Sequence, residues 1–278
     1  MHSNWRAASV VALTLLSSAI ALSGTAAAQT TAAAAKEYTP SVGQEGKDVI
    51  WVPTPQSLVE RMLTMAQVKP TDYVIDLGSG DGRTVITAAK KFGATALGIE
   101  YNPDMVELAK RAAEKEGVAG KAQFMKADIF QTDFSKATVL TMYLLPSLNL
   151  KLRPTILNLK PGTRVVSHAF TMDDWQPDQV DSSEGRTAYL WIVPAKVAGT
   201  WKLDGGGRNA EATFTQQYQN IGGSAKVDGK VAQFSSGKLR GDTITFAIDG
   251  REYTGRVAGD KIEGTVAGGK FTATRSGS

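Results

Sequence analysis

The chain contains no cysteine and only two histidines among its 278 residues. The absence of cysteine excludes a disulfide framework, a thiolate zinc site and a thiol nucleophile. His2 falls in the leader described below, so His168 is the one histidine of the mature chain. A multi-histidine metal site is therefore excluded, and a Ser-His-Asp triad would need His168 as its base. We expect no metal in this protein.

The excess of positive over negative charge is also small. The chain has 31 lysines and arginines against 27 aspartates and glutamates, a net charge of +4, and no long basic run. This pattern favours a solvated basic surface over a nucleic-acid tail, so we expect no nucleic-acid partner. A hydrophobic fraction of 42% is ordinary for a globular protein with a real core.

The first 28 residues are typical of a secretory signal peptide. Arg6 and the amino terminus give a weakly positive start, the apolar stretch AASVVALTLLSSAIAL spans 7–22, and Ala26–Ala28 precede Gln29. The apolar run is short for a membrane span of about 20 residues. We predict cleavage after Ala28 and a periplasmic location. The alternatives are an uncleaved membrane anchor and a misjudged start codon with a cytoplasmic chain.

Composition divides the rest of the chain into three parts. Residues 29–47 are small and polar with no period, which indicates a linker. Residues 48–197 alternate strand-like and helix-like segments. Residues 198–278 hold 16 of the 28 glycines and no proline, so we predict a separate Gly-rich β domain there.

The alternating part predicts an α/β domain. Thr54 followed by Pro55 predicts a helix start with a capping hydroxyl, and Asn102 followed by Pro103 predicts a second. Gly93 is expected to end the helix between them. Strands are expected over 72–77, 94–100, 122–128, 137–145, 163–170 and 187–195, and a further helix, kinked or restarted at Pro154, over 147–159. Such alternation predicts a mostly parallel sheet with helices on both faces.

The stretch VIDLGSGDGR, residues 74–83, places three glycines directly after the first strand of this sheet. Gly78, Gly80 and Gly82 allow a sharp turn and a close approach to a ligand at the carboxyl end of the sheet. Asp76 and Asp81 lie beside them and would repel a dinucleotide pyrophosphate. The sulfonium and ammonium of S-adenosyl-L-methionine (SAM) suit these acids, so we predict SAM as the cofactor.

Two more acids end the next two strands. Glu100 is placed to accept hydrogen bonds from ribose hydroxyls, and Asp128 from an adenine amino group. With their neighbours, the predicted cofactor-binding residues are Asp76, Gly78, Ser79, Gly80, Asp81, Gly82, Glu100, Tyr101, Asn102, Asp128 and Ile129.

VIDLGSGDGR, GIEYNP and KADIF are similar to the successive motifs of class I SAM-dependent methyltransferases, which implies a Rossmann-like fold over 49–193. Together with VPTPQ, MYLLP and RVVSHAF leading to Trp175, they resemble a narrower family of protein-lysine methyltransferases. That family includes mitochondrial enzymes acting on the ATP synthase c-subunit and the adenine nucleotide translocase. The resemblance implies that Asp76, Gly78, Gly80, Glu100 and Asp128 hold SAM, that VPTPQ covers the cofactor, and that a protein lysine accepts the methyl group. A small-molecule acceptor, or an exported binding protein without turnover, are the alternatives. A membrane is expected only through an uncleaved leader or a membrane-protein substrate.

The acceptor side is less defined. The end of the fourth strand lacks the Asn/Asp-Pro-Pro-Tyr/Phe motif that grips planar amino groups, which argues against a nucleobase acceptor. Tyr143 and Pro146 lie where an acceptor would enter. His168 is either a structural residue or a base, and Trp51 and Trp175 either wall the site or belong to the core. The candidates for facing the substrate are Tyr143, Pro146, His168 and Trp51, and no catalytic residue is assigned.

The last eighty residues read as short β segments separated by Gly and Asp-Gly turns. Asp249-Gly250 and Gly268-Gly269 are typical hairpin turns, and 243–248 alternates in strand fashion. We predict an antiparallel meander of about seven or eight strands that forms a small barrel or sandwich. Its role is either binding and assembly or passive stabilisation.

Overall fold

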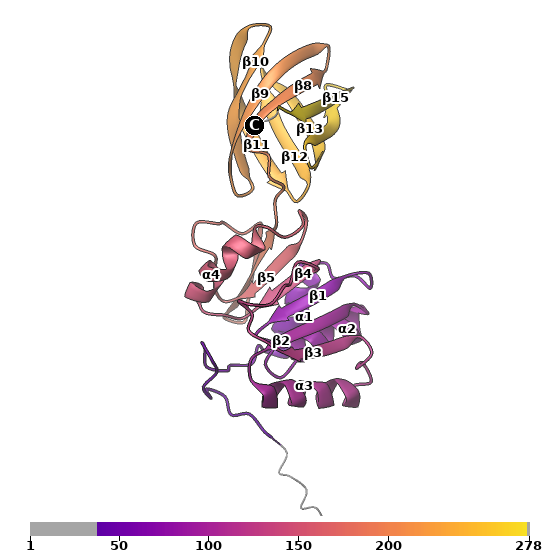
Figure 1. Ribbon diagram of the computed structural model, residues 1–278, viewed down its shortest axis with the longest axis vertical. Helices are drawn as coiled ribbons and strands as arrows, with labels where there is room; N and C mark the ends of the chain where they lie inside the picture. The colour runs from indigo at the N-terminus through magenta and orange to yellow at the C-terminus, as the bar shows by residue number, and fades with distance from the viewer. Residues whose placement is uncertain (1–37, 277–278) are drawn as a thin grey trace, which may run out of the picture. The chain divides into compact units, whose positions relative to one another are not determined.

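The computed structural model describes residues 38–276 (Figure 1). The predicted signal peptide, residues 1–28, lies outside the described residues, and so do residues 29–37 of the predicted linker. Within 38–276 the structure contains no helix with the length and apolar character needed to span a bilayer.

The α/β domain is built on a seven-stranded sheet with the order β3-β2-β1-β4-β5-β7-β6. Strands β1 to β5 run parallel, and β7 and β6 return antiparallel at one edge. The predicted mostly parallel sheet is therefore confirmed. Its elements are α1 (Gln56–Met65), β1 (Tyr73–Leu77), α2 (Arg83–Phe92), β2 (Thr95–Glu100), α3 (Pro103–Lys115), β3 (Ala122–Lys126), β4 (Val139–Met142), α4 (Pro146–Ile156), β5 (Arg164–His168), β6 (Gln179–Ser183) and β7 (Arg186–Ile192).

Helices pack on both faces of this sheet, because successive strand residues point to opposite sides. On β1, Val74 belongs to the core formed with α1, α2 and α3, whereas Ile75 belongs to the core formed with α4. Leu58 of α1 and Leu152 of α4 are buried in these two separate clusters. The two cores leave the carboxyl ends of the parallel strands free to carry a site.

Three local predictions need correction. Strand β6 was not expected, because its residues are polar and mostly exposed and so show no hydrophobic period. Helix α4 does not restart at Pro154 but continues through it to Ile156. The residue at the cap position of α1 is Pro55, whose side chain has no hydrogen-bonding group. The hydroxyl of Thr54 bonds His168 rather than the first turn of the helix. The predicted cap at Asn102 is confirmed, since its side chain accepts from the amides of Asp104 and Met105.

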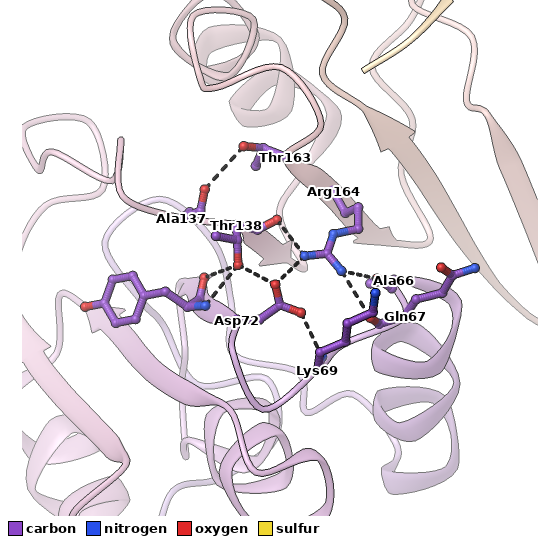
Figure 2. A network of polar contacts seen from close by, with 9 residues as sticks. Ala66, Gln67, Lys69, Asp72, Ala137, Thr138, Thr163 and Arg164 are labelled. Carbon is purple, nitrogen blue, oxygen red and sulfur yellow. Dashed lines mark hydrogen bonds and ion pairs between the residues drawn. The ribbon is translucent and has the colours of Figure 1, made fainter. Parts of the chain in front are cut away.

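A polar network fastens the amino ends of the strands (Figure 2). Arg164, at the start of β5, pairs with Asp72 and donates to the carbonyl oxygens of Ala66 and Gln67 at 3.0 and 3.1 Å. Burial would raise the pKa of Asp72, but hydrogen bonds from Arg164, Thr138 and the Lys69 amide outweigh it and hold that pKa below its ordinary value. These groups lie at the opposite end of the strands from the glycine loop, so we assign them to stability.

The carboxyl-terminal part is a closed barrel of eight antiparallel strands, as predicted. It closes where β15 pairs with β8. Aromatic rings fill its interior: Phe246 stacks on Tyr253 with ring centroids 4.9 Å apart, and Phe271 meets both rings edge-on. The strands are β8 (Gly199–Gly205), β9 (Arg208–Gln217), β10 (Asn220–Val227), β11 (Lys230–Arg240), β12 (Thr243–Ile248), β13 (Arg251–Ala258), β14 (Lys261–Val266) and β15 (Gly269–Arg275).

The turn between β9 and β10 contacts the segment that follows β5. The indole of Trp175 donates to the side-chain oxygen of Gln219 at 3.0 Å, and the Tyr218 hydroxyl donates to Asp174 at 2.9 Å. Trp175 is fully buried and its ring stacks on that of Tyr218. Trp175 is therefore a core residue rather than a wall of the site.

Candidate active site

A cavity of about 710 Å³ opens at the carboxyl ends of β1, β2 and β4. Most of the residues that line it belong to the glycine loop, to the segments after β2, β3, β4 and β5, and to a chain segment that precedes α1. We call residues 43–54 the strap. Its backbone forms a hairpin in which the Gly43 amide donates to Trp51 O and the Trp51 amide to Gln44 O, both at 2.9 Å.

The glycine loop turns sharply because three of its residues have left-handed backbone angles. Gly78, Gly80 and Gly82 have φ of 74°, 53° and 80°, which side chains rarely allow. A Cβ on Gly80 would lie 2.7 Å from the indole nitrogen of Trp51, so the strap and the loop approach closely. A Cβ on Gly82 would strike Phe124 and Ala109 at 2.7 Å. Gly78 and Gly80 line the cavity, whereas Gly82 serves the packing of α2.

Asp76 lines the cavity and is only 6% exposed. Its carboxylate accepts a hydrogen bond from Thr141 at 2.7 Å. Burial, assisted by the nearby charges of Glu100 and Asp81, raises the pKa of Asp76 to about 7 against that hydrogen bond. A cationic ligand group placed here would relieve the repulsion among these carboxylates.

Glu100 is held by two backbone amides. Its carboxylate accepts from Gly80 and from Asn102, each at 2.9 Å. The carboxylate therefore joins the glycine loop to the start of α3 while it lines the cavity. Tyr101, the next residue, also lines the cavity and is half-exposed.

Asp128 lines the cavity and is paired with the strap. Its carboxylate accepts from Lys47 at 2.8 Å and from the Phe130 amide at 2.9 Å. The Lys47 hydrogen bond, with that of the amide, holds the pKa of Asp128 below its ordinary value. Ile129 lines the cavity beside it.

Asp81 is part of a second connection to the strap. It forms an ion pair with Arg83 at 2.5 Å, and Arg83 also donates to the Thr54 carbonyl oxygen at 2.9 Å. The sequence assigns Lys47 to the linker, gives Arg83 no role and treats Thr54 only as a helix cap and as part of VPTPQ. The bonds that these residues form with Asp128, with the Thr54 carbonyl oxygen and with His168 join segments that are distant along the chain.

The acceptor side is aromatic and apolar. Tyr143, which follows β4, lines the cavity together with Leu145, Leu148 and Phe170, and Trp51 lines it from the strap. Pro146 and His168 are not among the lining residues. His168 packs against Tyr143, with ring centroids 3.8 Å apart, and is 2% exposed. Phe170 was not singled out from the sequence, although it stands two residues after His168 in RVVSHAF.

The donor set of this cavity fits SAM. The buried carboxylate of Asp76 suits a cation, Glu100 and Asp128 present acceptors for hydroxyl and amino groups, and the glycine loop leaves room for a close approach. The buried hydroxyl of Ser79 has no hydrogen-bond partner within the described residues, and it lines the same cavity. Within 38–276 no group of three or more His, Asp or Glu side chains is arranged to hold a metal. The fold and the site define a class I SAM-dependent methyltransferase.

Known proteins agree with this class. A model of the ANTKMT methyltransferase domain matches residues 76–179. A protein-lysine N-methyltransferase from Saccharolobus islandicus is 46% identical over 151 residues, which cover 52% of this chain and 94% of that protein. The human lysine N-methyltransferase of the ATP synthase c-subunit is 35% identical over 131 residues, 47% of this chain and 55% of the human protein.

A solved structure also matches. The RNA methyltransferase from Salinibacter ruber, crystallised with S-adenosyl-L-homocysteine, is 51% identical with a TM-score of 0.52, over 52% of this chain and 96% of that one. The chain belongs to the family of the protein-lysine N-methyltransferases, and its cofactor is SAM.

Proposed function

We propose that this enzyme transfers the methyl group of SAM to the side-chain amine of a protein lysine. The observation that carries the proposal is the composition of the acceptor side. Tyr143, Leu145 and Phe170 present aromatic and apolar surface where the amine would enter. The 46% identity with a protein-lysine N-methyltransferase over nearly all of that protein supports the same acceptor.

The chemistry explains why apolar surface suits a lysine. A lysine ammonium, with an ordinary pKa near 10.4, must lose a proton before its nitrogen can attack. An apolar surrounding disfavours the charged form and lowers that pKa. SAM, when bound, supplies a methyl group on a sulfonium, and transfer requires the nitrogen in line at about 3–3.5 Å.

The protein's own residues bind and orient rather than exchange protons. Asp76 and Glu100 supply negative charge at the cofactor end of the cavity, and the strap shields that end from water. His168 is an unsuitable base, because it is buried against Tyr143 and bonded to Thr54. The lysine proton would leave to water through the open acceptor side.

Methyl transfer can be tested without knowing the acceptor. The enzyme and labelled SAM are incubated with a bacterial envelope-protein extract and, separately, with total RNA from the same cells. We expect protease-sensitive label that mass spectrometry locates on lysine. At a SAM concentration below saturation, Asp76→Asn should reduce the label at least tenfold, and Glu107→Gln, which alters an exposed acid on α3, should leave it unchanged.

RNA is a second candidate acceptor. The Salinibacter protein, described as an RNA methyltransferase, is 51% identical to this chain over the matched region. Label that resists protease and is removed by ribonuclease would replace the lysine proposal with this one. Label on neither macromolecule, with SAM still bound, would favour a small-molecule acceptor or a binding protein without turnover.

We also propose that the protein is exported. The support is the charge, apolar stretch and Ala26–Ala28 of the first 28 residues. Fractionation of cells followed by sequencing of the mature amino terminus tests this. A periplasmic chain that begins at Gln29 is expected, and a cytoplasmic chain that retains residues 1–28 would contradict it.

A further inference from the structure

The strap lines the cavity, and apart from Trp51, which lies against the glycine loop, it buries little apolar surface. Ile50 and Val52 are exposed, although they lie on the strap beside the cavity. A segment with few buried apolar contacts has low local stability, so its polar connections decide whether it stays in place. Among the described residues, three hydrogen-bonded connections join the strap to the α/β domain.

Two of the three connections are partly accessible to water. Lys47 pairs with Asp128 at 2.8 Å, but both side chains are about one quarter to one third exposed (33% and 26%). Pairs of this kind contribute little, since water screens them. Arg83, itself 32% exposed, donates to the Thr54 carbonyl oxygen at 2.9 Å.

The third connection is buried. Thr54 Oγ1 and His168 Nδ1 share a hydrogen bond at 3.1 Å, and the two residues are 8% and 2% exposed. The Tyr143 ring lies against the imidazole with centroids 3.8 Å apart. Burial, with the charge of Arg186, lowers the pKa of His168 to about 4, so the ring is neutral at pH 7.

We propose that His168 is a positioning residue that fastens the strap over the cofactor cavity through Thr54. It joins the end of β5 to a segment 114 residues earlier in the chain. This role differs from that of a base, because His168 does not line the cavity. The role of His168 does not depend on which acceptor is methylated, since it concerns only the stability of the strap at the cavity.

Four variants separate this role from general packing. Thr54→Val and His168→Phe each remove the hydrogen bond while they keep much of the volume. His168→Asn restores it, because an Asn side-chain atom stands at the same distance from Cβ as Nδ1. Thr163→Val is the control, since it removes a buried hydroxyl that bonds Ala137 O away from the cavity.

Hydrogen exchange in the ligand-free protein is the first readout. The amides of Gly43, Gly46 and Trp51 are hydrogen-bonded within the strap hairpin. An isolated two-stranded hairpin is only marginally stable in water, so exchange at these amides reports release of the strap from the domain. We expect about fivefold to tenfold faster exchange at these amides in Thr54→Val and His168→Phe, as one lost hydrogen bond predicts. The double variant should equal either single one, and His168→Asn and Thr163→Val should stay within about twofold of the unaltered protein.

Calorimetric titration of S-adenosylhomocysteine is the second readout, and it should show the same pattern of weakened affinity. Unchanged exchange in Thr54→Val and His168→Phe, or damage in His168→Asn equal to that in His168→Phe, would overturn the proposal. Failure of the unaltered protein to bind S-adenosylhomocysteine would overturn the cofactor site instead, while the exchange data would still decide the role of His168.

Discussion

Asp76 and Thr141 stand directly opposite each other on adjacent strands β1 and β4, and the threonine hydroxyl donates to the carboxylate at 2.7 Å. A sheet register thus places a hydrogen-bond donor beside an otherwise buried acid. Burial favours the neutral carboxyl of Asp76, whereas the Thr141 hydrogen bond and a bound SAM cation favour the carboxylate. Binding of that cation and the protonation of Asp76 are therefore coupled.

Asp76→Asn should separate binding from stability. The amide keeps the size of the side chain and its acceptor for Thr141, but it cannot carry charge. We expect affinity for SAM to fall at least tenfold, about 1.4 kcal/mol, while thermal stability at pH 8 stays equal or rises because a buried charge is gone. Calorimetry and thermal unfolding measure the two effects. Equal affinity in the variant would exclude Asp76 from the cofactor site.

The affinity for SAM should depend on pH through the same residue. The pKa of Asp76 without ligand is raised to about 7 by burial, so below pH 7 the carboxyl is mostly protonated. Cation binding then releases a proton, and affinity should rise about tenfold per pH unit up to pH 7 and level off above it. Titrations from pH 5.5 to 8.5 test this, and Asp76→Asn should give a flat profile. A slope that persists in the variant would assign the coupling to another group.

The folded protein itself should respond to pH with the opposite sign. Between the ordinary pKa of 3.8 and about 7, folded Asp76 holds a proton that the unfolded chain has lost. The contribution of this residue to the free energy of unfolding therefore falls as pH rises through that window. From pH 5 to pH 7, the denaturant midpoint of the unaltered protein should therefore fall relative to that of Asp76→Asn. A constant difference would refute the raised pKa.

Arg164→Leu should destabilise the fold without affecting the site. It leaves the buried Asp72 carboxylate without its cation (Figure 2). Loss of one partner of a buried pair costs about 3–5 kcal/mol, and we expect the lower end because the Arg164 side chain is 19% exposed. Urea unfolding measures that loss, and Asp72→Asn combined with Arg164→Leu should lose less than the two single variants together. Affinity for SAM in the folded fraction should stay within about twofold, since the pair lies at the amino ends of the strands.

Asp128→Asn should weaken SAM affinity about fivefold, because an amide is a poorer acceptor for an adenine amino group than a carboxylate.

Lys47→Met should leave thermal stability unchanged, since water screens the pair that Lys47 forms. Calorimetry measures the SAM affinity of Asp128→Asn, and thermal unfolding measures the stability of Lys47→Met. A large loss of stability in Lys47→Met would show that the Lys47–Asp128 ion pair stabilises the whole domain and not only the strap.

The parts of the site that follow one another along the chain could be predicted from the sequence. Asp76, the glycine loop, Glu100 and Asp128 lie at or just after the ends of β1, β2 and β3, and parallel strands bring their carboxyl ends together. Contacts between distant segments could not be predicted. Lys47 meets Asp128 across 81 residues and Thr54 meets His168 across 114, and neither pair has a local pattern.

The same distinction explains the errors in the fold. Helix caps at Asn102 and Gly93 depend on neighbouring residues and were predicted. Strand β6 is held by its pairing with β7 rather than by a buried face, so its own residues carry no signal. Thr54 has a hydroxyl that could cap a helix, but in the fold this hydroxyl bonds His168 instead.

Closure of the barrel has a consequence for how this protein can associate with others. Every strand of the barrel has two hydrogen-bonded neighbours, so none offers a free edge for strand addition by a passing peptide. In the part of the chain that the structure describes, the sheet edges left unpaired are those of β3 and β6. A partner of the barrel must therefore recognise side chains and turns, and intermolecular β-pairing is confined to the methyltransferase sheet.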